Sequence, residues 1–345
     1  MIDKAPSSRA PDDLKQLSRD IDRKSMMPLW ERTGGMRPGS DCIAMHWHYS
    51  DIKPELLRAC ELITKKQAER RVLVLENEAL RGTTYITNTL YAGLQIILPG
   101  EIAPSHRHTP NALRFVVEGD GAYTAVDGER LMMHPGDFIV TPNWTWHDHG
   151  NLGDGPVVWL DGLDSPFTNF LGTTFREDLT DDRQNLFRQD GDNAAAFAAN
   201  MLPHDFRPAS AQSPILHYPY AQTKKALEHL AATTDPHPAH GVKLRYANPA
   251  TGRHPFSTMA VFMQRLPANF SGRDYRSTEG SVFCVVEGDG KLIAGEKTFE
   301  MTQHDVAVVP SWTAYRFETS TAMVIFSYSD RAGQEALGFW HDEDP

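Results

Sequence analysis

The sequence contains two copies of one pattern, and this repeat constrains the fold more than any other feature. Phe115–Gly121 reads Phe-Val-Val-Glu-Gly-Asp-Gly and returns as Cys284–Gly290, with only its first residue changed. Further along each copy, His134–Pro142 returns in a shorter form as Gln303–Pro310. A repeat of this kind indicates a duplicated structural unit. We therefore expect two domains of similar architecture in the 345 residues.

The residues from Val72 to Asp161 have a sequence pattern typical of an antiparallel β-domain. Short β-rich runs are separated by Gly, Pro and Asp; the runs are 90–98, 113–117, 122–126 and 138–140. The segments Gly119–Gly121 and Asp127–Gly128 predict hairpin turns. Short strands at this spacing favour a barrel or jelly roll. With the repeat, they predict one barrel in residues 1–175 and a second in residues 176–345.

Helical segments are predicted at only a few places. Residues 51–71 have apolar side chains at helical spacing, with Asp51 as a cap and Pro54 in the first turn. Two further helices are predicted over 192–201 and 224–232, and the Pro-rich stretch 234–240 is predicted to be a loop. Residues 1–25 are polar and are expected to be loosely ordered.

Three histidines in the first copy have the spacing of a metal site. His106 and His108 lie two residues apart, so on a strand they point to the same face of the sheet. His147 joins them from a neighbouring strand if the sheet closes on itself. Three neutral imidazoles suit a divalent transition metal and leave coordination positions open for chemistry. Such ligands also suit Mn, Ni, Cu or Zn.

The second copy lacks these histidines. When the two Glu-Gly-Asp-Gly turns are matched, Tyr275 falls opposite His106 and Ser277 falls opposite His108. When the following prolines are matched, Tyr315 falls opposite His147. We therefore expect the second domain to have a structural role, either packing against the first domain or supporting oligomerisation.

Charge and cysteine usage exclude several classes of function. The net charge of −11 argues against general affinity for nucleic acid, because phosphate binding needs clustered Lys and Arg. Cys42, Cys60 and Cys284 have no pairing or zinc-finger spacing, which fits a reducing compartment. No apolar run approaches the roughly 20 residues that span a bilayer. We expect a cytoplasmic protein without a membrane or nucleic-acid partner.

Two longer motifs carry a family resemblance. The patterns Gly-x5-His-x-His, ending at His108, and Gly-x5-Pro-x-Trp-x2-His-x3-Asn, ending at Asn151, resemble the two cupin motifs. The first cupin motif usually carries a Glu ligand where this chain has Ala112. A triad of histidines alone is similar to the bicupin ring-cleaving dioxygenases of gentisate, salicylate and 1-hydroxy-2-naphthoate. Among these, the amino-acid sequence most resembles the gentisate 1,2-dioxygenase family. The matching segments are 68–77, 89–95, 104–109, 112–115 and 159–161.

The resemblance implies a fold, a cofactor and a reaction. The fold is mainly β, a bicupin of two double-stranded β-helix (jelly-roll) barrels with helical N-terminal and connecting segments. The cofactor is Fe(II), held by His106, His108 and His147. The reaction cleaves gentisate with O2, between the carboxyl- and hydroxyl-bearing carbons, to give maleylpyruvate. A substrate anion is attracted to the metal because a three-histidine site contributes no negative charge.

Several residues are candidates for binding the aromatic acid. Arg114 follows His108 on the next strand, and its guanidinium matches a carboxylate; the alternative is a structural ion pair. Arg70 is a second basic candidate, equally well explained as a packed or solvated surface residue. Tyr91, Gly93 and Gln95 alternate along one strand and share a face that is either the pocket wall or ordinary barrel core. Gly93 is expected to leave space beside the substrate ring.

Two more residues are candidates for catalysis. His149 shares a strand face with His147 and is expected to donate to the substrate or to oxygen; the alternative is a satisfied barrel histidine. Asp161 is expected either to orient a pocket group or to take the proton of the para-hydroxyl; the alternative is a buried carboxylate paired to Arg. The pair His46 and His48 repeats the His-x-His spacing without the rest of the motif. We interpret it as an ordinary strand or loop feature.

Alternative functions remain open at this point. Salicylate, substituted salicylates and 1-hydroxy-2-naphthoate offer the same carboxylate and ortho-hydroxyl. A cupin that binds or isomerises a small acid without O2 is a different class, and the fold alone does not exclude it. Two histidines of the loop 234–240, His237 and His240, are expected to face solvent. Exposed sheet edges predict a homo-oligomer, either a dimer or a tetramer.

Overall fold

The computed structural model describes residues 11–31, 38–199 and 201–343, which fall into two compact units, Met1–Pro38 and Gly39–Pro345. In the first unit, α1 (Pro11–Asp22) is followed by the short helix η1 (Leu29–Glu31). The expectation of loose order is therefore wrong for α1; residues 1–10 lie outside the described residues. Acidic side chains in the first turn of α1 and Arg19 in its last turn favour a helix through its dipole. No described helix is long and apolar enough to cross a membrane.

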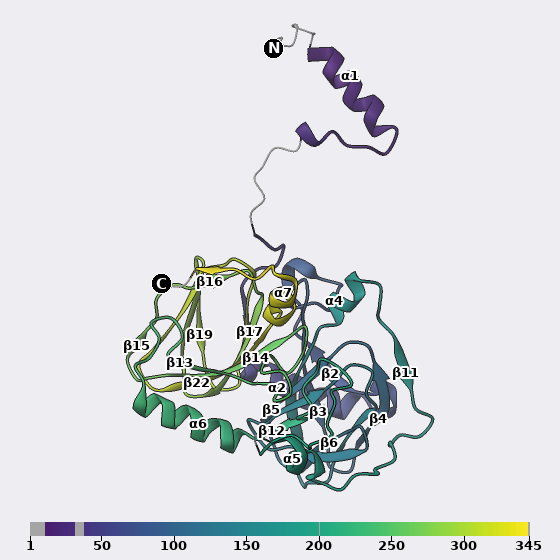
Figure 1. Ribbon diagram of the computed structural model, residues 1–345, viewed down its shortest axis with the longest axis vertical. Coiled ribbons are helices and arrows are strands. Elements are labelled where there is room, and N and C mark those ends of the chain that lie inside the picture. Colours follow the sequence, from purple (N-terminus) through teal and green to yellow (C-terminus); the bar gives the residue numbers. More distant parts are fainter. Residues whose placement is uncertain (1–10, 32–37, 200, 344–345) are drawn as a thin grey trace. The chain divides into compact units, whose positions relative to one another are not determined.

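The second unit consists of two β-barrels (Figure 1). In the first barrel a six-stranded sheet, in the order β12-β8-β5-β10-β3-β2, faces a five-stranded sheet, in the order β11-β4-β9-β6-β7. These strands are β2 (Arg71–Val74), β3 (Tyr91–Ile97), β4 (Ile102–His108), β5 (Ala112–Glu118), β6 (Ala122–Val126), β7 (Glu129–Met132), β8 (Phe138–Thr141), β9 (His147–Asn151), β10 (Val157–Leu163), β11 (Arg176–Asp178) and β12 (His217–Tyr218). All the described pairings between them are antiparallel, as expected.

The second barrel repeats this plan. A six-stranded sheet, in the order β1-β20-β17-β22-β14-β13, faces a four-stranded sheet, in the order β15-β21-β18-β19, and β16 pairs with β23. These strands are β1 (Met45–Trp47), β13 (Val242–Arg245), β14 (Ala260–Leu266), β15 (Phe270–Ser271), β16 (Arg276–Ser277), β17 (Ser281–Glu287), β18 (Gly290–Ala294), β19 (Lys297–Met301), β20 (Val306–Val309), β21 (Tyr315–Thr319), β22 (Met323–Ser329) and β23 (Asp342–Glu343). The prediction of two jelly-roll barrels is confirmed.

The two halves exchange edge strands. β1 precedes the first barrel in sequence but pairs with β20 of the second barrel, and β12 follows the first barrel's main strands but pairs with β8. Each edge strand leads into a helix: α2 (Tyr49–Leu62) packs on β2 and β3, and α6 (Tyr220–Thr233) packs on β13 and β14. We name residues 45–62 the first arm and residues 217–233 the second arm. The domain division at residue 175 stays a prediction, and β11 and β12 join the first barrel.

The helix predicted over 51–71 is shorter than expected. α2 begins at Tyr49 after His48, so Pro54 lies inside the helix and not in its first turn. The helix stops at Leu62 because Thr64 starts a new one, α3 (Lys65–Ala68), through a capping box with Gln67. The remaining helices are η2 (Glu78–Leu80), α4 (Ser165–Phe170), α5 (Asp192–Phe197) and α7 (Arg331–Leu337). α5 and α6 overlap the two other predicted helices.

The turn at Gly119–Gly121 differs from the prediction. It joins β5 to β6, which lie in different sheets, so it is a crossover between sheets and not a hairpin. Gly119 has a φ of +87°, and a Cβ there would lie 2.3 Å from the carbonyl oxygen of Pro156. The position therefore requires glycine. The hairpin predicted at Asp127–Gly128 is confirmed between β6 and β7.

The main hydrophobic core lies between the two six-stranded sheets. Phe115 of β5 stacks on Phe326 of β22, with ring centroids 4.1 Å apart and planes inclined by 10°. Each barrel also has its own interior cluster, around Trp159 in the first barrel and around Phe317 in the second. The shared core fixes the two barrels against each other.

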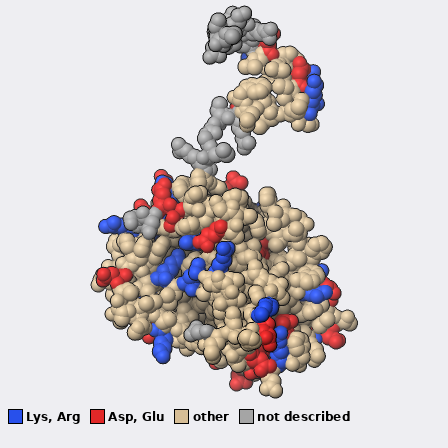
Figure 2. All heavy atoms as spheres, viewed as in Figure 1, with Lys and Arg blue, Asp and Glu red and all other residues tan. Residues whose placement is uncertain are grey.

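Lys and Arg are interspersed with Asp and Glu among the described residues on the face shown in Figure 2.

Candidate metal centre

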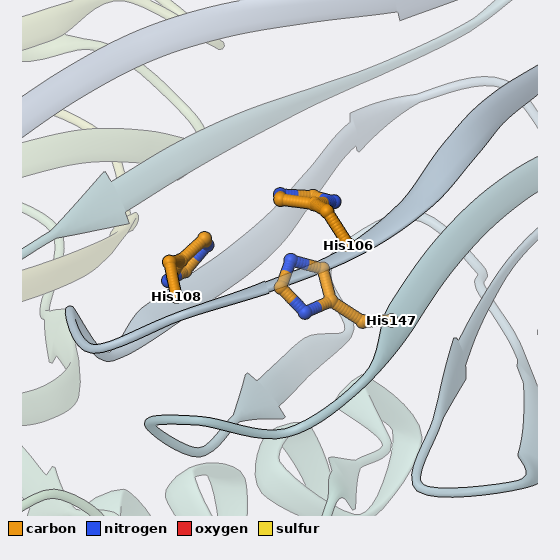
Figure 3. Close-up of side chains that lie close together, drawn as sticks. All are labelled: His106, His108 and His147. Carbon is orange, nitrogen blue, oxygen red and sulfur yellow. The ribbon is translucent and has the colours of Figure 1, made fainter. Parts of the chain in front are cut away.

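The predicted histidines come together inside the first barrel. His106 and His108 lie on β4, and His147 begins β9, directly opposite His106 in the strand register. One ring nitrogen from each lies within 4.8 Å of the others. Figure 3 shows the three rings converging on one point. The period of two along β4 and the closure of the barrel bring them together, as the sequence predicts.

The backbone orients two of these rings with their Nε2 atoms available. Nδ1 of His108 lies 2.8 Å from the carbonyl oxygen of Pro110, and Nδ1 of His147 lies 2.8 Å from that of Thr145. A carbonyl only accepts, so each Nδ1 carries the proton and donates it. Nε2 of His147 is buried and has no hydrogen-bond partner among the described residues. A buried nitrogen of this kind requires a partner, and a metal ion fits it.

All three imidazoles are held neutral. Burial lowers the pKa of His108 to about 4 and lowers those of His106 and His147 further below their ordinary value. Arg70 adds to the effect on His106. The neutral form is the one that binds a metal, so the cluster needs no deprotonation at neutral pH. The donor set, its burial and its protonation state all fit a divalent transition metal.

Arg70 and a bound metal make opposite demands on His106. Nη2 of Arg70 lies 2.6 Å from Nδ1 of His106 and 2.7 Å from the carbonyl oxygen of Pro104. A guanidinium only donates, so Nδ1 accepts in this arrangement, and the proton of the neutral ring sits on Nε2. Metal binding through Nε2 requires the other tautomer, whose Nδ1–H donates to Pro104, 3.3 Å away. Arg70 is therefore a partner of the triad, a contact that no pattern in the sequence predicts.

Arg114 and Asp161 form a buried pair across neighbouring strands. They face each other in the register of β5 and β10, and Asp161 faces Gly93 of β3 in turn. Nε of Arg114 lies 3.5 Å from Oδ1 of Asp161, and the Trp159 indole donates to the same oxygen at 3.0 Å. Arg114 also donates to the hydroxyl of Thr141. Burial raises the pKa of Asp161 to about 6.

The face shared by Tyr91, Gly93 and Gln95 is largely buried, but the space beside Gly93 is not open. A Cβ at Gly93 would lie 2.7 Å from the Tyr91 hydroxyl and 2.7 Å from Cγ1 of Val72. Gly93 thus makes room for the tyrosine side chain of its own strand. Gln95 is 2% exposed and lines a small cavity together with Arg70. The roles of these residues in substrate binding stay predictions.

His149 has one nitrogen without a partner. Nδ1 lies 2.9 Å from the Thr124 hydroxyl, and Nε2 is buried without a hydrogen bond to any residue that the structure describes. Its ring centroid lies 6.0 Å from that of His147 and 5.4 Å from that of Trp159. Burial keeps its pKa well below the ordinary value. It therefore stands next to the triad as a neutral group with hydrogen-bonding capacity to spare.

Comparison with known proteins identifies the family. The chain is 46% identical to gentisate 1,2-dioxygenase 1 of Aquipseudomonas alcaligenes over 95% of both chains. The chain belongs to the gentisate 1,2-dioxygenase family. A model of the cupin domain matches residues 93–162, which contain the triad. The chain is also 36% identical to 1-hydroxy-2-naphthoate 1,2-dioxygenase of Nocardioides sp., covering 91% of this chain and 82% of that protein.

A solved structure of the same fold agrees. Salicylate 1,2-dioxygenase from Pseudoaminobacter salicylatoxidans, in its adducts with gentisate, superposes with a TM-score of 0.90. The two chains are 32% identical, and the match covers 98% of this chain and 96% of the other. The fold prediction and the predicted family are thus confirmed, and this member of the gentisate 1,2-dioxygenase family is a dioxygenase.

The second barrel of this dioxygenase lacks the triad. Tyr275 and Tyr315 form an isolated antiparallel bridge, matching the pairing of His106 with His147 in the first barrel. The predicted replacements therefore lie where the sequence placed them. Ser277, which the sequence matched to His108, is buried and donates to Glu279.

Aromatic side chains occupy two further positions of the second barrel that correspond to site positions in the first. In the first barrel, Asp161 lies between Gly93 and Arg114 in the strand register. In the second barrel, Ser327 lies in the same way between Phe262 and Phe283. Two phenyl groups thus replace a glycine and an arginine. Matching the strands of the two copies, as well as their motifs, would predict both replacements from the sequence.

Two histidine pairs differ from the interpretation of the sequence. His240 does not face solvent: it is half-buried, its ring centroid lies 4.4 Å from that of Tyr275, and His237 stacks on it at 5.0 Å. His46 and His48 are more than an ordinary strand feature, because both rings contact Asp305 in the second half of the chain. A contact between residues so distant in sequence leaves no local pattern.

Proposed function

We propose that the protein is an Fe(II)-dependent dioxygenase that cleaves gentisate between its carboxyl- and hydroxyl-bearing carbons to give maleylpyruvate. The observation that carries the proposal is the buried cluster of three neutral imidazoles beside the buried pair of Arg114 and Asp161. The identity of 46% with a gentisate 1,2-dioxygenase supports this substrate. Other metals suit three histidines, so iron is part of the proposal.

His106, His108 and His147 would hold the iron. Bound Fe(II) would supply the redox chemistry that moves electrons from an electron-rich ring to O2. Two of the rings are already fixed by backbone carbonyls, so little reorganisation is needed when the metal binds. His106 would then carry its proton on Nδ1 and donate to the carbonyl oxygen of Pro104, and it would no longer accept from Arg70. The guanidinium of Arg70 would thus be available to an anionic substrate at the edge of the site.

Arg114 would bind the substrate carboxylate. Its Nε–H has no close hydrogen-bond acceptor, and its distance of 3.5 Å from Asp161 makes a loose ion pair. A carboxylate offers two oxygens to a guanidinium and forms shorter, charge-assisted hydrogen bonds. The incoming anion would thus take over part of the charge compensation that Asp161 provides. This releases the Asp161 carboxylate for a second task.

Asp161 would accept the proton of the para-hydroxyl. With its pKa raised to about 6, the carboxylate is mostly ionised at neutral pH and yet is basic enough to share a proton. Nε2 of His149, buried and without a partner, would hydrogen-bond to a substrate oxygen or to O2. Tyr91, Gly93 and Gln95 would form the wall next to these groups.

Oxygen uptake tests this proposal. The iron-loaded protein is given gentisate or salicylate side by side, with anaerobic controls, and its iron content is measured. We expect uptake with gentisate and little with salicylate. Absence of uptake with every 2-hydroxybenzoate and 1-hydroxy-2-naphthoate, from protein shown to hold iron, would contradict it and favour a cupin that binds or isomerises a small acid.

A salicylate dioxygenase is the second candidate. The likeness to salicylate 1,2-dioxygenase from Pseudoaminobacter salicylatoxidans favours it, since its match covers nearly the whole chain. In this case the para-hydroxyl is dispensable, and Asp161 would only orient Arg114. Comparable oxygen uptake with gentisate and salicylate would establish the broader enzyme.

We also propose a cytoplasmic homo-oligomer, a tetramer or a dimer. The described cysteines are all free thiols, which fits a reducing compartment. In the first unit Met27, Leu29 and Trp30 are exposed by 67%, 74% and 64%, and exposed apolar side chains of this size favour association. Light scattering after size exclusion tests the assembly, and a monomer at micromolar concentration would contradict it.

A further inference from the structure

A second cluster of metal-binding side chains lies where the first arm meets the second barrel. Nε2 of His46 lies 3.0 Å from Oδ2 of Asp305, and Nδ1 of His48 lies 3.1 Å from the same oxygen. The two ring centroids are 4.2 Å apart. The side chains of His46 and Asp305 are 6% and 1% exposed, whereas that of His48 is 48% exposed. The cluster is thus buried on one side and open to water on the other.

The carboxylate oxygen of this cluster is crowded. Besides the two imidazoles, the backbone N–H of Thr302 donates to Oδ2 at 2.9 Å and its hydroxyl lies 3.2 Å away. The other oxygen, Oδ1, accepts from the backbone N–H of Tyr49, at 2.7 Å. Four donors exceed the capacity of one oxygen, which has about two lone-pair directions. Hydrogen bonding therefore gives a poor account of why both histidines point there.

The second arm provides an internal comparison, because it makes the same attachment with one histidine. Nε2 of His217 lies 2.8 Å from Oδ2 of Asp137, and the backbone N–H of Tyr220 donates to Oδ1 at 2.8 Å. Asp137 is the counterpart of Asp305 in the sequence repeat. Pro219 stands where the first arm has His48. A single imidazole is thus enough to attach an arm, and His48 is surplus to that purpose.

We propose that His46, His48 and Asp305 bind a divalent transition metal ion, at a site separate from the triad. Two imidazoles and a carboxylate are ligands of Zn²⁺ and similar ions. Ligands at about 2.0–2.1 Å around a tetrahedral ion lie about 3.3 Å from one another. The two N···O separations of 3.0 and 3.1 Å are therefore close to those of a metal site, and water completes it from the exposed side.

Such an ion would fasten the two halves of the molecule together. Two ligands come from the first arm, and the third lies in the turn before β20 of the second barrel. Metal binding would oppose detachment of β1 from β20, which pair over only three residues. The ion would thus be structural, and its loss would leave the ring-cleaving site intact.

Zinc binding by the full-length iron-loaded protein tests the site. The protein is dialysed against Zn²⁺, and both metals are measured by elemental analysis. We expect iron to be retained and about one zinc to bind per chain. His48→Gln should lose the zinc, keep the iron and keep the rate of ring cleavage. The matched variant His217→Gln alters the one-histidine attachment and should keep the zinc.

Two further measurements make the result decisive. Zinc should raise the thermal midpoint of the wild-type protein and leave that of His48→Gln unchanged, because a ligand stabilises only the form that binds it. His106→Ala, in which the triad is damaged, should still bind zinc. The proposal is overturned if the wild-type protein binds no zinc beyond the triad, or if His48→Gln binds as much zinc as the wild type.

Discussion

Replacing Asp137 by Ala should detach the second arm from the first barrel. The Asp137 side chain is 4% exposed and accepts from Nε2 of His217, from the backbone N–H of Tyr220 and from that of His134. His134 is exposed, so its N–H regains water when the carboxylate is removed. The other two donors are only partly exposed. Leaving a buried donor unpaired costs about 1–3 kcal/mol, so the two together predict a loss of about 2–6 kcal/mol.

Urea unfolding, followed by tryptophan fluorescence, measures this loss as a shift of the midpoint. Protein concentration and iron content must be held constant, because association and ligand binding also move the midpoint. Asp120→Ala is the matched control: this residue contacts the His134 ring at 2.9 Å, but its side chain is 68% exposed. An exposed pair contributes about 0–1 kcal/mol. If the two variants lose equally little, the reasoning about the arm is refuted.

Three further predictions concern the active site. The pKa of Asp161 is raised to about 6, and Asp161 must be ionised to accept a proton, so activity should rise as the pH increases through about 6. A pH–rate profile of the wild type should show this rise. The profile of Asp161→Asn, a slower enzyme, should not show it. Loss of a residue that hydrogen-bonds to a metal ligand lowers metal affinity by roughly 10–100-fold. His147→Ala removes a ligand itself, so the iron retained after desalting should fall by more than this factor, and oxygen uptake should fall with it. Gly93→Ala places a Cβ 2.7 Å from the Tyr91 hydroxyl, so it should lower the free energy of unfolding in urea by about 1–3 kcal/mol. It should also raise the KM for gentisate, because Tyr91 must move. An unchanged KM would argue that Tyr91 lies outside the substrate pocket.

The triad was predictable because its signal is local. His106 and His108 follow the period of a strand, and the repeat identified which residues of the second copy to compare with them. The positions of Tyr275 and Tyr315 therefore follow from the sequence alone, and the two residues form the expected bridge. Periodicity and repetition are properties of the sequence itself, so both survive without knowledge of the tertiary contacts.

The contacts between the halves were not predictable in the same way. β1 and β12 are three and two residues long, too short for a periodic pattern, and their partners lie far away in sequence. The contact of Arg70 with His106 depends on where the segment after α3 meets β4. Helix α1 is a different case, because Leu14, Leu17 and Ile21 lie at helical spacing and predict an amphipathic helix from the sequence alone. For the other contacts tertiary packing decides, and single-sequence patterns do not carry that information.

The reciprocal exchange of arms has an evolutionary consequence. After a duplication, one copy is usually free to degenerate or to be deleted. Here deletion of the second copy would remove β12 from the sheet of the copy that keeps the triad. Selection could therefore relax on the interior of the second barrel, where Phe262 and Phe283 now stand, while it continued to act on the strand edges. The second copy would thus be retained for the edge strand that it supplies to the barrel with the triad.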